Sequence, residues 1–321
     1  MNNRLLSVMT WNIYFGASLL PLFNSTQSQI PFRVTEVFRQ FLATNFPMRA
    51  KAIAQVIYIN NPDIIGLQEA AIWKLIPQNS KVVEYDFIEI LLHELEKLGL
   101  CYKAVAINNN FSGTLPSSTI NLVSLQDRDV ILVRKSSKIQ IIDKQEANFV
   151  NNSAVSIGGQ QITILQGWSY IDAYFKGIKF RLLNTHLDAA SEDIRLKQVN
   201  ELITGPGNTS LPLIFIGDFN SDANNNGITY EQLILAGFED AWNIAGIGEG
   251  FTCCQDSDVL NSFSTLNTRI DLIVFKNFEY IDVEMIEVVG DKQEDRTRTR
   301  LWPSDHASVV AKFDINCHCN K

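Results

Sequence analysis

The sequence predicts a mixed α/β fold built on sheets, and three observations support this. Short runs rich in Ile, Val, Leu and Phe recur along the 321 residues, which is typical of strands. Patterns of helical period lie between several of these runs. No internal repeat, low-complexity tract or Pro/Gly/Ser-rich linker divides the chain. We therefore expect a single domain over residues 1–321.

The expected elements follow one another along the chain, with helices between several of the strands. Strands are expected where branched and aromatic residues are dense, at residues 5–11, 63–67, 129–133, 161–165, 178–184, 213–216, 269–275 and 307–313. Helices are expected where apolar residues recur at helical spacing, at residues 48–58, 87–98, 192–203 and 230–235.

Composition places the chain among folded, soluble proteins. Hydrophobic residues make up 46% and charged residues 19% of the sequence, and these values lie far from those of disordered chains. The net charge of −8 disfavours a protein that binds nucleic acid through a broad basic surface. A bound metal cation can supply positive charge locally, so a nuclease stays open.

Neither a membrane span nor a signal peptide is expected. No run approaches the ~20 apolar residues that cross a bilayer, so we expect no integral membrane segment. The apolar stretch at residues 5–9 is too short for a signal peptide. Three locations stay open: the cytoplasm, export after removal of a targeting segment, and export by another route. We expect a monomer.

Residues 14–47 form an unusual segment in which large apolar residues are interrupted by proline and polar residues. Its apolar members are Leu19, Leu20, Leu22, Phe23, Phe32, Phe38, Phe41 and Phe46. One interpretation is an insertion beside the site that acts as an apolar lid or makes peripheral contact with a membrane. The other is ordinary core packing with a helix around residues 34–42, and we favour it.

Five cysteines are present, so at least one is unpaired. They are Cys101, Cys253, Cys254, Cys317 and Cys319. The Cys-His-Cys run near the C-terminus has two special interpretations, which are metal binding and a bridge to the region of Cys253. We expect structural thiols instead, with no part in catalysis.

Two polar residues at the ends of the first expected strands offer oxygen ligands. Asn12 ends the first strand, and Glu69 follows the strand at residues 63–67. Strand ends hold side chains rigidly at a cleft, and Mg²⁺ prefers hard oxygen ligands while keeping waters and substrate phosphate. In isolation the two would be a turn asparagine and a surface glutamate. Their context makes them candidate ligands of Mg²⁺, with Mn²⁺ as an alternative.

Three further polar residues follow later strands. His186 stands just past the run at residues 178–184; alone, such a histidine is more often structural than catalytic. Asp218 and Asn220 follow the run at residues 213–216 and are two positions apart, so both can face the same side. One can accept a proton while the other donates to a phosphate oxygen.

Asp271 lies inside an otherwise apolar run and needs a partner, because an unpaired buried carboxylate is costly. The expected partner is His306, in Ser-Asp-His. A carboxylate that accepts from one imidazole nitrogen fixes the tautomer and raises the basicity of the other nitrogen. His306 would then be ready to act on water.

The order of these motifs is more specific than any one of them. Trp-Asn, Leu-Gln-Glu, Asn-Thr-His, Gly-Asp-Phe-Asn, Arg-Ile-Asp and Ser-Asp-His together resemble the endonuclease/exonuclease/phosphatase superfamily, over residues 10–313. The resemblance implies a four-layer αββα sandwich, with two mixed β-sheets packed face to face and helices outside. It also implies a metal cleft at one edge of the sheets.

The resemblance implies that Asn12 and Glu69 bind the magnesium, and that Asp305 helps to hold the metal or positions the histidine after it. Arg128 is a weaker candidate for contact with the substrate phosphate, since a surface arginine is at least as common in such a place.

The resemblance also implies the catalytic roles. Asp218 and Asn220 would orient the attacking water and the phosphate. His306, braced by Asp271, would activate the water or stabilise the phosphate, and His186 would protonate the leaving oxygen or bond to a phosphate oxygen. Charge that develops on phosphate oxygens is stabilised by a cation, an imidazolium and an amide in a water-poor cleft.

Two departures from the motifs of known subfamilies narrow the range of expected substrates. Tyr14 stands where apurinic endonucleases carry an aspartate, and Ser221 and Asp222 stand where inositol polyphosphate 5-phosphatases carry an arginine. The remaining resemblance is to pancreatic DNase and neutral sphingomyelinases, so the expected substrate is a phosphodiester of nucleic acid or of a phospholipid head group. The alternatives are an inactive binding protein with the same fold, or a phosphomonoesterase acting on a small substrate.

Overall fold

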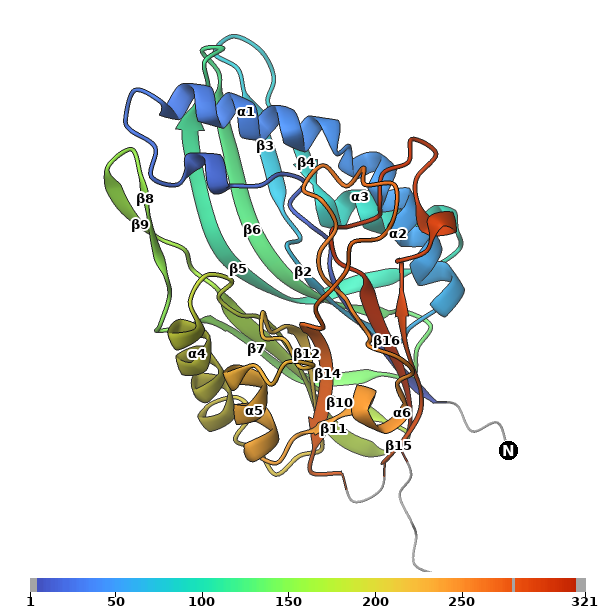
Figure 1. The fold of residues 1–321 in the computed structure, drawn as a ribbon. Coiled ribbons are helices and arrows are strands. Elements are labelled where there is room, and N and C mark those ends of the chain that lie inside the picture. Colours follow the sequence, from blue (N-terminus) through green and yellow to red (C-terminus); the bar gives the residue numbers. More distant parts are fainter. Residues whose placement is uncertain (1–4, 279–280, 316–321) are drawn as a thin grey trace, which may run out of the picture.

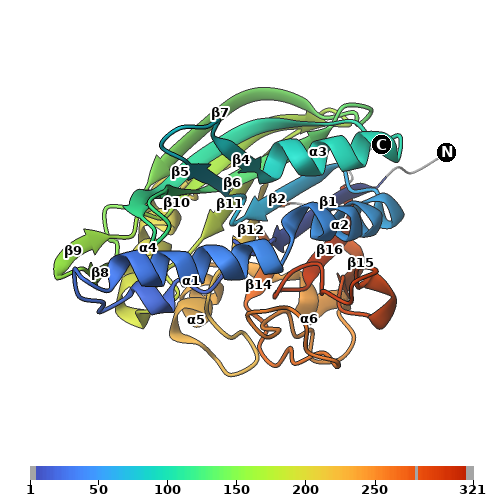
Figure 2. The same cartoon turned by 90° about the horizontal axis from the view of Figure 1, so that it is seen from above.

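Two large mixed β-sheets pack face to face, and helices cover the outer face of each (Figures 1 and 2). The computed structural model describes residues 5–278 and 281–315. The fold class expected from the sequence is confirmed, including the four layers in the order helix, sheet, sheet, helix.

The first sheet has the strand order β15-β16-β1-β2-β6-β3-β4, with β5 paired to β6. Its members are β1 (Leu6–Asn12), β2 (Ile64–Gln68), β3 (Ile72–Ile76), β4 (Val83–Asp86), β5 (Tyr102–Pro116), β6 (Leu122–Arg134), β15 (Ile281–Val289) and β16 (Ser308–Ile315). The strands β1 and β2 run parallel, and their neighbours pair antiparallel. The C-terminal ends of β1 and β2 therefore meet at one edge of the sheet.

The second sheet has the order β13-β14-β12-β11-β10-β7. Its members are β7 (Gln140–Asn148), β10 (Gly167–Phe175), β11 (Ile178–His186), β12 (Leu213–Asp218), β13 (Glu239–Asp240) and β14 (Asp271–Lys276). The strands β11 and β12 are parallel, whereas β14 is antiparallel to β12. A separate hairpin is formed by β8 (Ala154–Ile157) and β9 (Gln160–Thr163).

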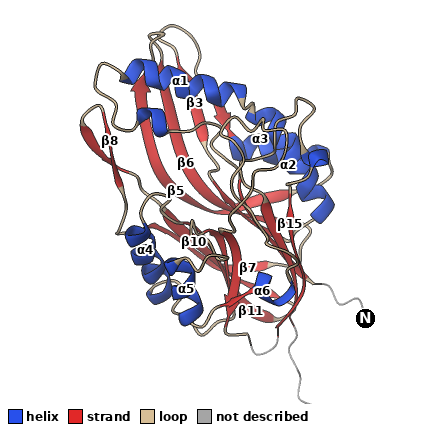
Figure 3. Ribbon diagram, in the orientation of Figure 1, coloured by secondary structure: helices blue, strands red, loops and turns tan. Residues whose placement is uncertain are grey.

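Helices flank the sheets on opposite sides (Figure 3). Those on the first sheet are α1 (Ile30–Ala43), α2 (Phe46–Asn60) and α3 (Phe87–Lys97), and those on the second are α4 (Glu192–Thr204) and α5 (Ile228–Leu235). Short helical turns are η1 (Leu20–Leu22), α6 (Ala241–Ala245) and η2 (Gln293–Asp295). Side-chain caps begin α3 and α4, because Asp86 and Ser191 accept hydrogen bonds from backbone N–H groups of the first turn.

Three apolar layers hold the sandwich together. The layer between the sheets includes Val8, Ile131, Leu182, Ile214 and Phe275, all buried. Apolar clusters on the two outer faces bury the helices against the sheets. Burial of apolar side chains is the dominant favourable term in folding, so this packing fixes the strand ends that carry the polar residues.

The segment at residues 14–47 packs against the first sheet. Its helix α1 covers the one expected around residues 34–42, and the ring of Phe41 stacks on Trp73 with centroids 4.8 Å apart. Leu20 and Phe32 remain 71% and 69% exposed. Most of the segment is therefore core packing, and a few apolar side chains face outward beside it.

Most expected elements are confirmed, with shifted ends. The strand expected at residues 161–165 is displaced, because β9 is Gln160–Thr163. Several strands were not expected, above all β5, β7, β10 and β15. Cys317 and Cys319 lie outside the described residues, and Cys253 and Cys254 form a disulfide, with Cys253 paired to Thr268 and His306 in isolated β-bridges. Within residues 5–278 and 281–315, we find no helix with the length and hydropathy of a membrane span.

Candidate active site

Three candidate residues form a row across the second sheet. His186 ends β11, Asp218 ends β12 and Asp271 begins β14; His186 pairs with Asp218, and Asp218 pairs with Asp271, in the strand register. The Nε2 atom of His186 lies 3.5 Å from Oδ2 of Asp218. Gly217 allows this close pairing, because a Cβ atom there would overlap the carbonyl of Thr185 on the neighbouring strand.

The expected pair of Asp271 and His306 is present. Nδ1 of His306 lies 2.8 Å from Oδ2 of Asp271, and Nε2 lies 3.9 Å from Oδ2 of Asp218. Burial opposes the charge on His306, but the carboxylates, Asp271 foremost, outweigh it and raise the pKa of His306 well above its ordinary value. His306 is thus a buried imidazole whose second nitrogen faces a second carboxylate.

The first sheet contributes Asn12 and Glu69 to the same place. The Nδ2 atom of Asn12 donates to Oε1 of Glu69 at 3.2 Å and to Oδ2 of Asp218 at 3.1 Å. The other oxygen of Glu69 accepts from the N–H of Phe15 at 2.7 Å. Glu69 adopts a left-handed backbone conformation with φ 56°. Asn12 therefore links Glu69, which follows a strand of the first sheet, to Asp218 in the row on the second sheet.

A second contact ties the sheets together nearby. Gln68, the last residue of β2, donates from Nε2 to Oδ1 of Asn184 on β11 at 2.7 Å. Both side chains are fully buried. The same Gln68 amide donates to Oγ1 of Thr10 at 3.2 Å. These bonds satisfy amide groups that would be costly to bury alone.

Two carboxylates of the cluster lie where it borders a cavity. Glu69 and Asp305 both line the cavity there. Burial, followed by the charge of Asp305, raises the pKa of Glu69 to about 8, and burial raises the pKa of Asp305 as well. Oδ1 of Asp271 is buried without a hydrogen-bond partner. A divalent cation fits this set, because hard oxygen ligands surround a position where negative charge is unfavourable without one.

Other possible metal ligands lie beside these carboxylates. Ligand atoms of Asp218, Asp271 and His306 lie within 4.8 Å of one another. Those of Cys253, Cys254 and His306 are equally close, but the two cysteines form a disulfide and offer no thiolate. Since Nδ1 of His306 is already bonded to Asp271, we assign the cation to Asn12, Glu69 and Asp305 in the proposal that follows.

Two carboxylates were missed by the sequence analysis. Asp127 and Asp129 on β6 are buried, and Asn110 donates to both, at 3.0 and 2.9 Å. Burial, followed by the charge of Asp127, raises the pKa of Asp129 to about 7. Burial opposes the charge on His186, but Asp218, Asp129, Glu69 and Asp127 outweigh it and raise the pKa of His186 to about 9. The alternation of Asp127 and Asp129 along one strand was the available signal in the sequence, because residues two apart on a strand face the same side.

Arg49 was also missed. It is fully buried in α2 and donates to the carbonyl oxygens of Ile13 at 2.8 Å, Tyr14 at 3.0 Å, Thr44 at 3.1 Å and Pro303 at 2.9 Å. Burial lowers the pKa of Arg49 to about 10. The guanidinium therefore joins the loop after Asn12 to the loop before Asp305.

The last two candidates have different surroundings. Nδ2 of Asn220 donates to the carbonyl of Leu187 at 2.9 Å, and its N–H donates to Oδ1 of Asp218 at 2.9 Å. The structure does not bring Arg128 to the cluster. Its guanidinium donates to the carbonyl of Ala70 at 2.9 Å and to Asp86 at 2.7 Å, so it joins β6 to the start of α3.

A cavity of about 360 Å³ opens over the cluster. Its polar wall includes Glu69, Asp127, His186 and Asp305. Its volume lies in the range of small-molecule sites, so carboxylates and an imidazole line a space that a substrate can enter.

The sequence matches the family described as "Endonuclease/Exonuclease/phosphatase family" over residues 9–306. The chain belongs to the endonuclease/exonuclease/phosphatase family. The comparison with curated protein sequences gave no match.

Solved structures of the endonuclease/exonuclease/phosphatase family share the fold. A family protein from Leptotrichia buccalis has a TM-score of 0.60 at 17% identity, covering 96% of this chain and 99% of that one. A mannosyl-6-phosphatase from Bacteroides thetaiotaomicron has a TM-score of 0.56 at 18% identity, covering 96% and 99%. D. rerio TDP2 complexed with a single-strand DNA product has a TM-score of 0.57 at 15% identity, covering 96% and 98%.

Proposed function

We propose that this chain is a magnesium-dependent phosphodiesterase, with Mn²⁺ as an alternative ion. The observation that carries the proposal is the in-register row of His186, Asp218 and Asp271, with His306 bonded to Asp271 and bordering Asp218. Membership of a family of phosphoester hydrolases supports the reaction class.

In this proposal the cation is held by Asn12, Glu69 and Asp305. When bound, it neutralises charge on the phosphate oxygens and lowers the pKa of water. The amide nitrogen of Asn12 donates to Glu69 at 3.2 Å, and its Oδ1, which accepts from the N–H of Tyr14 at 3.1 Å, would be the ligand atom for the cation. Burial, followed by the charge of Asp305, raises the pKa of Glu69 to about 8, and a nearby cation would favour the charged form of this carboxylate.

The remaining residues handle water and protons. Asp218 orients the attacking water and accepts its proton, and Asn220 positions the phosphate. His306 stabilises charge on the phosphate through Nε2, because Nδ1 is bonded to Asp271. His186, whose pKa is raised to about 9, is protonated at neutral pH and donates to the leaving oxygen. General acid–base catalysis of this kind contributes about 10²–10⁴-fold to rates.

Two substrate classes are carried by the proposal, nucleic acid and a phospholipid head group. The family fold serves nucleic acid in a neighbour, since the D. rerio TDP2 structure contains a single-strand DNA product. The net charge of −8, the exposed Leu20 that lines the cavity and the exposed Phe32 on α1 favour a lipid, through peripheral contact of residues 14–47. A phosphomonoester is a third class, favoured by the mannosyl-6-phosphatase with the same fold.

The test is hydrolysis of supercoiled plasmid and of sphingomyelin vesicles in parallel, each with Mg²⁺ and with EDTA. The inactive variant is His306→Ala, and the matched control is His93→Ala, because His93 is exposed on α3. We expect magnesium-dependent turnover of one substrate that His306→Ala abolishes and His93→Ala keeps. Glucose or mannose 6-phosphate serves as the monoester arm; activity confined to that arm, or absent from all three, contradicts the proposal.

A further inference from the structure

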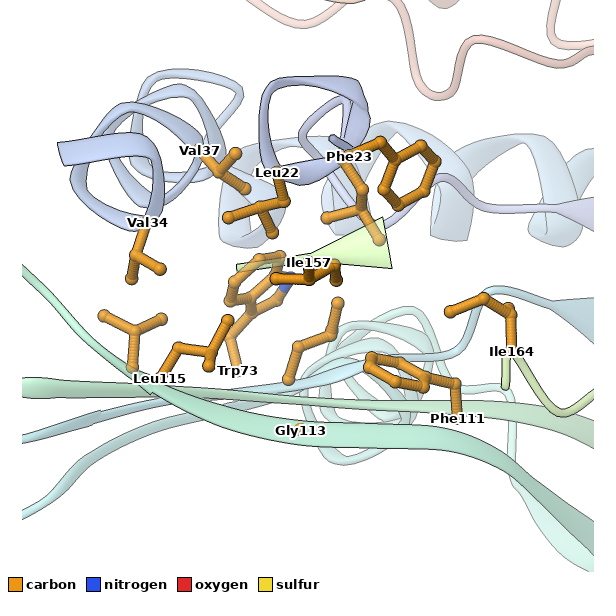
Figure 4. A pocket seen from close by; sticks show the side chains of 13 residues that line it. Leu22, Phe23, Val34, Val37, Trp73, Phe111, Gly113, Leu115, Ile157 and Ile164 are labelled. Carbon is orange, nitrogen blue, oxygen red and sulfur yellow. The ribbon is translucent and has the colours of Figure 1, made fainter. Parts of the chain in front are cut away.

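A second, wholly apolar pocket of about 60 Å³ lies beside the catalytic cavity. Figure 4 shows side chains from η1 and α1, such as Leu22, Val34 and Val37, facing Trp73 and Leu115 from the first sheet. Every side chain that lines this pocket is apolar. Such a space beside a phosphoester site calls for an apolar occupant.

The pocket and the catalytic cavity have a common wall. Leu19, Phe23, Phe111, Leu125 and Ile164 line both. The two spaces are therefore neighbours, with carboxylates and an imidazole on the catalytic side and only apolar side chains on the other. A ligand that fills both is amphiphilic, with its phosphate on the catalytic side.

A bulge in β5 contributes to both spaces. The register between β5 and β6 shifts between Asn109 and Ser112, and this places Asn110 and Phe111 within the irregular stretch. Asn110 donates to the carboxylates of Asp127 and Asp129, whereas Phe111 lines the apolar pocket. Bulges re-aim side chains next to active sites, so the same two residues shape the polar and the apolar parts.

The chemistry of the lining excludes a nucleobase as the occupant. The Nε1 atom of Trp73 is already bonded to the carbonyl of Phe15 at 2.9 Å, so it offers no free donor. A base would leave its own donors and acceptors unsatisfied there, which costs about 1–3 kcal/mol for each group. An alkyl chain has none to lose. Since about 15 Å³ of such space holds one water-sized group, the pocket has room for about four methylene groups.

We propose that this pocket receives the alkyl or acyl chain of an amphiphilic phosphoester whose phosphate lies at the catalytic residues. The inference rests on the proposed function for the position of the phosphate, and it names the substrate class of that site. In this proposal the alkyl chain of the ligand leaves the catalytic cavity past Phe23 and Phe111 and lies beneath α1.

The first experiment uses 4-nitrophenyl phosphodiesters that carry a methyl, butyl or octyl group, each below its aggregation concentration, with Mg²⁺. We expect kcat/KM of the natural protein to rise about fourfold for each methylene that enters the pocket, and to level off once the pocket is full. An equal kcat/KM for all three esters overturns the proposal, as does faster hydrolysis of a short DNA oligonucleotide than of the octyl ester.

Two variants change the pocket in opposite ways. Leu115→Phe fills it and Leu22→Gln makes its wall polar; both side chains are half-buried and line the apolar pocket but not the catalytic cavity. Each variant should flatten the dependence on chain length and leave kcat/KM for the methyl ester within about twofold of the natural protein. The control is Leu235→Gln, at an 82% exposed position at the end of α5. A chain-length dependence that both variants retain overturns the proposal.

A binding measurement separates this inference from the reaction. Calorimetry with methyl phosphate and octyl phosphate, on His306→Ala in the presence of Mg²⁺, needs no turnover. Tighter binding of octyl phosphate, lost in Leu22→Gln/His306→Ala, supports the pocket even if no diester is hydrolysed, in which case the proposed function alone fails. Equal binding of the two phosphates overturns the pocket even where hydrolysis occurs.

Discussion

The Nδ1 atom of His306 lies 2.8 Å from Oδ2 of Asp271, and both side chains are buried. The residues are 35 positions apart in the chain, and the bond fixes which imidazole nitrogen faces Asp218. A histidine oriented by a carboxylate keeps a single tautomer ready for chemistry.

Replacing Asp271 with Asn should therefore lower kcat by about 100-fold or more. The carboxylate raises the pKa of His306, so its loss lowers that pKa and shifts the His306 limb of the pH–rate profile to lower pH. The measurement is the profile of kcat against pH for both proteins. Asp143→Asn, at an exposed position of β7, is the control; a profile of Asp271→Asn that overlays the natural one would count against the bond's role.

Asp129→Asn should lower the pKa of His186. The charges of Asp218, Asp129, Glu69 and Asp127 together raise this pKa to about 9, and removing one negative charge weakens the preference for imidazolium. The check is an NMR titration of the histidine ring protons in EDTA. The exposed His93 provides the internal reference. An equal pKa of His186 in Asp129→Asn and in the natural protein would mean that the charge of Asp129 does not act on the imidazole.

The stability of the metal-free protein should fall as pH rises. The pKa of Glu69 is raised from 4.5 to about 8 and that of His186 from 6.5 to about 9. Both groups hold a proton more tightly in the folded state, so their stabilisation is complete below the unfolded pKa and is lost as pH rises through the folded one. Thermal midpoints between pH 6 and 9 in EDTA measure the decline.

Adding Mg²⁺ should raise the thermal midpoint more at pH 9 than at pH 6, because the cation binds deprotonated carboxylates. Glu69→Gln should make the decline in EDTA shallower and reduce the effect of Mg²⁺. A midpoint that rises with pH in EDTA, or a Mg²⁺ effect that Glu69→Gln retains in full, would show that these carboxylates do not hold the ion.

Arg49→Met should destabilise the protein by about 3 kcal/mol, because four buried carbonyl oxygens lose their donor. Urea unfolding gives the free energy. Affinity for Mg²⁺ should also fall, since the guanidinium joins the loops that follow Asn12 and precede Asp305. Arg33→Met, at a half-exposed position of α1, is the control. Equal unfolding free energies for Arg49→Met and the natural protein would refute the role assigned to Arg49.

The strands that carry the candidate residues were predictable because they are buried and nearly continuous in apolar residues. β12, for example, is Leu-Ile-Phe-Ile followed by Gly and Asp218. The strands that were missed are polar for a physical reason. β7 is largely exposed, and β5 carries three consecutive asparagines, two of which are buried against the site. The polar side chains of these strands face the site or the solvent rather than an apolar core.

The parts of the site that were missed depend on tertiary contacts. The strand expected at residues 129–133 is in fact β6, Leu122–Arg134, and only this longer strand places Asp127 and Asp129 together. Arg49 sits in a good helical sequence, where an arginine ordinarily faces water. Three of its four backbone partners, Ile13, Tyr14 and Pro303, lie far from it in the chain, and no local pattern indicates them.

The hydrogen bond between Gln68 and Asn184 crosses from one sheet to the other at 2.7 Å, and the candidate residues are divided on either side of it. Asn12 and Glu69 follow strands of the first sheet, whereas His186, Asp218 and Asp271 belong to the second. Neither half is a catalyst alone. The candidate site can therefore form only when both sheets have packed against each other, so a chain in which one sheet is unfolded lacks half of the candidate residues.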